Sequence, residues 1–270
     1  HPWQCWCSCL LILNQCRMRI FLKTEDEIIL LRAASQLATR ALIEVGRHVV
    51  PRLALSHLRN KVVNAVMRTA PTELNSGKEA PSSDTEFTFF VNGAYIEPSL
   101  EGECMLCEGD WLTVNCWVCL DGYYSFGAHT FIVGSSQDDE PLTSTLRDML
   151  RQVVRRASAG HSIKEMSRTV YSLHSHDPYV LQKTFGHGVG RNRVENPILR
   201  MNPGVNDTVL LKEGMCLVIA LAFKHGRSHL IKPRLMHEST FHNPFVPFGI
   251  TVVVRPGRPE ILTSFETIVK

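Results

Sequence analysis

The chain has 270 residues, of which 44% are hydrophobic and 20% are charged, as is ordinary for a soluble globular protein. This length suits one large domain or two small ones, and it excludes any need for disulfides or metal in order to fold. The nine cysteines are odd in number and follow no secretory signal, so they do not indicate a disulfide framework. We therefore expect a reducing compartment.

The first residues differ in character from the rest of the chain. They begin with His, and their apolar run at residues 9–14 is too short to span a membrane. They also lack the arginine- and serine-rich amphipathic pattern of a transit peptide. We therefore set residues 1–19 apart as an N-terminal extension, leave open whether residues 1–17 are native, and treat residues 20–270 as one domain.

The clearest predicted helix begins near Lys23. Thr24 can cap it, acidic residues occupy its first turn, and Pro51 ends it. Its apolar residues recur every three or four positions: Ile28, Leu31, Ala34, Leu37, Ala38 and Ala41. A second helix is expected around Leu58–Arg68, followed by a polar loop at residues 70–86.

The rest of the chain alternates between predicted strands and helices. Two β-rich runs flank Asp121-Gly122, a dipeptide that favours tight hairpin turns. The other expected elements are a strand at 86–96, helices at 144–157 and 163–173, and strands at 214–223 and 248–256. The order of helices, strands, helices and strands predicts an α+β domain with two similar halves.

Basic residues gather in one part of the sequence. Residues 141–200 contain ten Lys or Arg against four Asp or Glu. Arg147, Arg151 and Arg155 are spaced four apart, so a helix would align them in a stripe that Arg156 extends. This stripe is either a solvated helix face or a contact to RNA, phosphate or an acidic protein surface.

Four cysteines have spacing that zinc sites use. Cys104, Cys107, Cys116 and Cys119 form C-x2-C-x8-C-x2-C. The second pair falls within a predicted strand, where residues three apart point to opposite faces and cannot both reach one ion. Small buried hydrophobic residues are therefore the stronger interpretation, and zinc is the alternative.

Several segments together resemble one family of enzymes. "VNGAYIEP", "GDWLTVNCWVCLDGYYSFGAHTFIVG", "GHGVGRNRVENP", "LKEGMCLVIALAF" and "ITVVVRPGRPEILTSF" follow one another in order, after "KTEDEIILLR". Their order and spacing resemble the type I methionine aminopeptidases, from about Ile20 to the C-terminus. The resemblance implies the pita-bread fold: two pseudo-symmetric halves with curved antiparallel sheets covered by helices.

The resemblance also implies where a metal site would lie. The family holds two metal ions with two Asp, one His and two Glu, and the metals polarise the scissile carbonyl and generate hydroxide. The five corresponding positions are Asn115, Phe126, His187, Ala220 and Gly249. Only the histidine is retained, and the family's two auxiliary histidine positions hold Glu97 and Val194. Each lost ligand costs several kcal/mol of metal affinity, so the sequence predicts no dinuclear site, no cofactor and no peptidase activity.

A chain of this kind is expected to act through its surface. The arginines on the predicted helix, with Arg191 and Arg193 near the pocket rim, suggest a structural or binding subunit of a larger assembly of protein and RNA. A ribosome, in the mitochondrion or the cytoplasm, is the expected example, with neither a membrane span nor a small-molecule substrate. The alternatives are a mononuclear metallohydrolase using His187 with Asn115 or Glu97, and a module that binds a peptide N-terminus without cleaving it.

Overall fold

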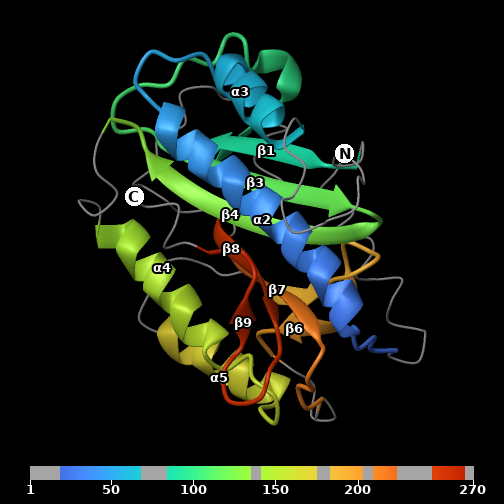
Figure 1. Cartoon of the computed structure of the whole chain (residues 1–270). Coiled ribbons are helices and arrows are strands. Elements are labelled where there is room, and N and C mark those ends of the chain that lie inside the picture. The colour runs from blue at the N-terminus through green and yellow to red at the C-terminus, as the bar shows by residue number, and fades with distance from the viewer. Residues whose placement is uncertain are drawn as a thin grey trace.

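The computed structural model describes residues 19–67, 84–134, 141–174, 183–202, 209–223 and 245–264. The N-terminal extension, apart from Arg19, and most of the expected polar loop lie outside these residues. The elements are α2 (Glu25–His48), α3 (Leu55–Met67), β1 (Glu86–Val91), β2 (Ala94–Ile96), η1 (Pro98–Leu100), β3 (Trp111–Leu120), β4 (Tyr123–Ile132), α4 (Pro141–Val154), α5 (Ile163–His174), β5 (Thr184–Gly188), β6 (Glu195–Arg200), β7 (Cys216–Phe223), β8 (Phe245–Val253) and β9 (Glu260–Ile261) (Figure 1).

The described strands form a single nine-stranded antiparallel sheet. Its order is β2-β1-β3-β4-β8-β7-β5-β6, with β9 paired to β8. The first half of the chain supplies β1–β4 and the second half β5–β9, and the halves join where Ala128 of β4 pairs with Gly249 of β8. The predicted α+β order is confirmed, but the two halves share one continuous sheet.

The strongest local signals produced the expected elements. Thr24 and Glu27 form a capping box at the start of α2, in which each side chain accepts a hydrogen bond from the other residue's backbone N–H. The β3–β4 hairpin turns at Asp121 and Gly122, whose φ angles are 51° and 77°. Both predictions are therefore confirmed.

Some predicted boundaries were wrong. The segment 86–96 is a hairpin of β1 and β2, because Asn92 and Gly93 take φ angles of 51° and 77° and reverse the chain. Helix α3 begins at Leu55, three residues earlier than expected. Helix α4 begins at Pro141 and ends at Val154, after which the N–H groups of Arg156 and Ala157 bond to carbonyls three residues back.

The sheet has two unlike faces. Alternate residues of β3, such as Val114, Cys116 and Val118, belong to a large core that also contains residues of α2, α3, α4 and α5. Trp117, which alternates with them, belongs to a second, smaller core. Figure 1 shows α2 lying across β3 and β4. Among the described helices, none is long and apolar enough to cross a membrane.

Candidate functional site

The five positions identified by the resemblance lie on neighbouring strands. Asn115 on β3 pairs with Ala128 on β4, Ala128 pairs with Gly249 on β8, and Gly249 pairs with Ala220 on β7. Phe126 pairs with Trp117, and His187 on β5 pairs with Val218 on β7. Sheet pairing thus places residues 72 or more apart in sequence, such as Asn115 and His187, in the central strands of one sheet.

Aromatic side chains occupy the space beside Gly249. A Cβ atom added to Gly249 would lie 2.5 Å from Cε1 of Phe126 and 3.1 Å from Cβ of Ala220. The Phe126 ring is fully buried, and its centroid is 4.8 Å from that of Trp117. The space that a carboxylate on residue 249 would need is therefore taken by the Phe126 ring.

His187 lies in an apolar and tightly packed environment. Its Nδ1 is 2.8 Å from the carbonyl oxygen of Gly188, and its ring stacks on Trp117 with centroids 6.2 Å apart. Burial lowers its pKa to about 4, against smaller opposing effects of the Gly188 hydrogen bond and Glu195, so the ring is neutral at pH 7. A Cβ on Gly186 would collide with the carbonyl oxygen of Val218, so the absence of a side chain permits the close backbone approach here.

Asn115 is buried without a hydrogen-bond partner. Its side chain is on a residue that is 1% exposed, and neither its Oδ1 nor its Nδ2 has a partner within the described part of the chain. Glu97 follows β2 and Val194 precedes β6, and both are only half-buried. No described contact joins either residue to Asn115 or His187.

These residues do not fit the two metal ions implied by the resemblance. Phe126, Ala220 and Gly249 offer no ligand atom, and Asn115 offers only a neutral oxygen. Across the described ranges, no three His, Cys, Asp or Glu side chains lie close enough together to hold an ion. A dinuclear centre would require several new carboxylates and the removal of the Phe126 ring.

The sheet separates the second pair of cysteines in the zinc-like pattern. Cys116 belongs to the large core. Cys119 follows it by three residues on the same strand, so its side chain faces the other side of the sheet. Cys104 is buried and Cys107 is half-buried. Burial raises the pKa of the Cys116 thiol far above its usual range, which favours the protonated and non-ligating form.

The predicted arginine stripe is only partly exposed. Arg147 is 7% exposed and is therefore removed from the predicted contact surface. A spacing of four residues advances about 40° around a helix, so the stripe begins near the buried face and ends in solvent. Arg151, Arg155 and Arg156 are exposed at the C-terminal end of α4, and Arg151 pairs with Asp148 at 2.9 Å.

Arg191 and Arg193 contact aromatic side chains of the β3–β4 hairpin. Arg191 lies 4.8 Å from the ring centre of Tyr123, and Arg193 lies 5.7 Å from that of Trp117. Arg193 also binds the carboxylate of Glu86 at 2.6 Å. Arg193, Trp117 and His187 are thus linked in one series of contacts, which holds the loop before β6 against the hairpin.

Two contributions to this region were not predicted from the sequence. Trp117 lies two residues after Asn115, so strand alternation could have placed both on one face. The buried ion pair between Lys23 and Glu195, 2.6 Å long, joins residues 172 positions apart and has no local signal.

Comparison with known proteins identifies the family. The model of metallopeptidase family M24 matches residues 29–254, most of the chain. This chain belongs to metallopeptidase family M24. The methionine aminopeptidase of Borreliella burgdorferi is 25% identical over 255 residues, covering 91% of this chain and 99% of that protein. That of Clostridium perfringens is 26% identical, covering 90% and 98% respectively.

Solved structures of M24 proteins share the fold. Methionine aminopeptidase from Thermotoga maritima has a TM-score of 0.70 at 22% identity, covering 91% of this chain and all of that one. Prolidase from Pyrococcus furiosus has a TM-score of 0.66 at 20% identity, covering 90% of this chain and 65% of that one. The pita-bread fold predicted from the resemblance is confirmed.

The same comparisons contradict the prediction that this M24 protein is not an enzyme. Its relatives are methionine aminopeptidases that match it over nearly their whole length. The replacements at Asn115, Phe126, Ala220 and Gly249 concern only the metal ligands that the resemblance implies. The identity of the relatives outweighs these replacements, and the prediction that the protein is not an enzyme is wrong.

Proposed function

We propose that this M24 protein acts as a binding subunit of a larger assembly that contains RNA, such as a ribosome in the mitochondrion or the cytoplasm. The observation that carries the proposal is the basic surface formed by Arg151, Arg155 and Arg156 at the C-terminal end of α4. Helix α5, which packs against α4, adds the exposed cations Lys164 and Arg168. Closely spaced arginines suit a chain of phosphates, each of which accepts a bidentate guanidinium contact.

Local structure explains part of this arrangement without RNA. Cations at the end of a helix interact favourably with its dipole, and Arg151 already has Asp148 as a partner. However, Arg155 and Arg156 have no acidic partner in the described part of the chain, although each adds repulsion to the other. An external anion would relieve that repulsion.

The test is the affinity of the full chain for a labelled 20-nucleotide RNA hairpin, measured by fluorescence anisotropy at several salt concentrations. We expect the variant Arg151→Gln/Arg155→Gln/Arg156→Gln to bind at least tenfold more weakly. The slope of log affinity against log salt concentration should also become smaller by about two to three, because each lost phosphate contact lowers it by about one. The matched control, Arg47→Gln/Arg52→Gln/Lys61→Gln, removes the same charge from α2, α3 and the turn between them, and should bind as the parent does. Equal loss in both variants, or preference for polyglutamate over RNA, would contradict the proposal.

A second candidate is a divergent metallohydrolase. What supports it is the enzymatic nature of the relatives together with Asn115, a buried amide with no hydrogen-bond partner in the described residues. Metal content by elemental analysis and cleavage of a methionyl peptide, each compared between the parent, Asn115→Ala and His187→Ala, test it. A bound ion that both substitutions remove would support this candidate over a binding subunit.

A further inference from the structure

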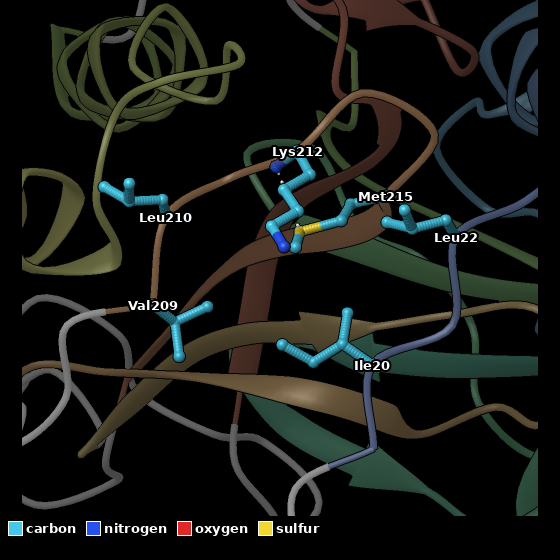
Figure 2. A pocket seen from close by; sticks show the side chains of 6 residues that line it. All are labelled: Ile20, Leu22, Val209, Leu210, Lys212 and Met215. Atoms are coloured by element: carbon cyan, nitrogen blue, oxygen red, sulfur yellow. Dashed lines mark hydrogen bonds between the residues drawn. The ribbon is translucent and has the colours of Figure 1, made fainter.

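A groove lies between the segment before α2 and the segment before β7. It encloses about 420 Å³ and is lined by Ile20, Leu22, Val209, Leu210, Lys212 and Met215. Figure 2 shows Ile20 and Leu22 on one side, Val209 and Leu210 on the other, and Lys212 and Met215 between them. We call it the N-terminal groove. It is separate from the strands that carry Asn115 and His187.

Both walls of the N-terminal groove are held by hydrogen bonds to the fold. On one side, Ile20 forms a β-bridge with Asn196, and the Lys23 N–H donates to the carbonyl of Gly214 at 2.8 Å. On the other, the Leu211 N–H donates to the carbonyl of His161 at 2.8 Å. The groove is therefore preformed, and a ligand would not need to order it.

The surface around the N-terminal groove is apolar and exposed. Phe21 is 49% exposed, Leu22 is 50% exposed and Leu210 is 53% exposed. Single exposed apolar residues are common, but two of these three line one concave site and the third adjoins Leu22. An apolar side chain of a partner that covered this surface would stabilise the complex by burying it from water.

The charges beside the groove indicate the sign of its partner. Glu25 and Glu213, which flank it in sequence, are drawn toward the single guanidinium of Arg255, which also pairs with Glu260. Arg19 and Lys212 are exposed and have no acidic partner among the described residues. Lys212 itself lines the groove, so it offers a positive charge directly beside the apolar side chains.

We propose that the N-terminal groove binds an extended peptide segment of a partner protein, in which large apolar side chains alternate with carboxylates. The apolar side chains occupy the space between Leu22 and Leu210, and a carboxylate pairs with Lys212. The proposal is independent of RNA binding by α4, because the two surfaces use different residues.

The probes are three labelled 12-residue peptides. In the first, Leu and Phe alternate with Asp and Glu. In the second, Lys replaces the acidic residues, and in the third, Ser replaces Leu and Phe. Anisotropy titration of the full chain should give at least tenfold tighter binding of the first peptide than of either other. Lys212→Glu should reverse the preference between the first two peptides. Leu210→Asp should weaken the first at least tenfold.

Val50→Asp is the matched control, because Val50 is 51% exposed beyond the other end of α2. It should bind the first peptide as the parent does. Equal binding of the three peptides, an unchanged preference in Lys212→Glu, or equal losses in Val50→Asp and Leu210→Asp would overturn the proposal. Lys212→Glu changes an exposed charge, so it remains informative if Leu210→Asp does not fold.

A second copy of the chain is the competing occupant. Sedimentation velocity of the parent and of Leu210→Asp distinguishes it: the proposal expects the same mass for both. If the parent dimerises, Leu210→Asp is monomeric and no peptide competes, then the groove is a self-association site and the proposal is wrong.

Discussion

The ring of Phe126 lies where a side chain on Gly249 would have to begin. An ideal Cβ on Gly249 would be 2.5 Å from Cε1 of Phe126, a separation that real Cβ atoms do not show. The two residues sit on adjacent strands that meet at the junction of the two halves of the sheet. A phenylalanine at position 126 therefore requires a glycine at position 249.

This dependence predicts a strong energetic coupling. Gly249→Ala should lower the free energy of unfolding by about 2 kcal/mol, because the added methyl overpacks a filled core. Phe126→Ala should cost about 3–5 kcal/mol through the cavity it creates. In the Phe126→Ala background, the alanine at 249 should cost less than about 0.5 kcal/mol, because its methyl now has room. Urea unfolding of the four proteins measures the coupling, and additive costs would show that the ring does not limit this site.

Local patterns were sufficient for much of the fold. The capping box at Thr24 and Glu27 and the turn at Asp121 and Gly122 depend on residues at most three apart, so the sequence displays them directly. The Asn92-Gly93 turn is equally local, but apolar residues continue on both sides of it, so the pattern of hydrophobicity alone predicts one unbroken strand. The Asn-Gly dipeptide, which is typical of tight hairpin turns, is the local signal for the reversal.

The environment of the site required tertiary information. Sequence identified Phe126 and Gly249 as positions, but only strand pairing brings the ring of one against the other. Four-residue spacing correctly placed Arg147 and Arg151 on one helix, but α4 ends before Arg155, and the rotation of the helix against the sheet buries Arg147. Lys23 and Glu195 meet because two distant segments pack together, which no local pattern records.

His187 should make stability depend on pH within a defined window. Burial lowers its pKa to about 4 in the folded protein, below the ordinary value of 6.5. Between these values the unfolded chain binds more protons, so stability falls as the pH drops from about 6.5 to about 4, by up to about 3 kcal/mol. Above pH 6.5 the residue contributes no pH dependence.

The measurement is the urea midpoint of the parent and of His187→Gln at half-unit pH intervals. The difference in unfolding free energy between the two proteins should vary between pH 4 and 6.5 and be constant from pH 7 to 8. Glu25, Glu27 and Glu165, whose pKa values are lowered by hydrogen bonds, contribute equally to both proteins and cancel. A constant difference throughout would mean that His187 is protonated as readily in the folded state as in the unfolded one.

The buried ion pair between Lys23 and Glu195 should be costly to break from either side. Both side chains are 5% exposed, and Glu195 also accepts a hydrogen bond from the Asn192 N–H at 3.1 Å. Lys23→Met or Glu195→Gln should each lower the unfolding free energy by about 3–5 kcal/mol, because each leaves a buried charge without its partner. The double variant should lose much less than the sum. Thermal and urea unfolding of the four proteins would contradict this if the costs were additive.

Burial should also rank the reactivity of the cysteines. Desolvation raises the pKa of Cys216 to about 12 and that of Cys116 higher still, whereas Cys107 is only half-buried. Because the thiolate is the reactive form, a disulfide reagent such as Ellman's should modify Cys107 in the folded protein and reach Cys116 only on unfolding. Cys107→Ser should therefore remove one equivalent from the fast phase, and Cys116→Ser should remove none. A fast equivalent lost in Cys116→Ser would mean that β3 opens in the native state and exposes the large core beneath α2.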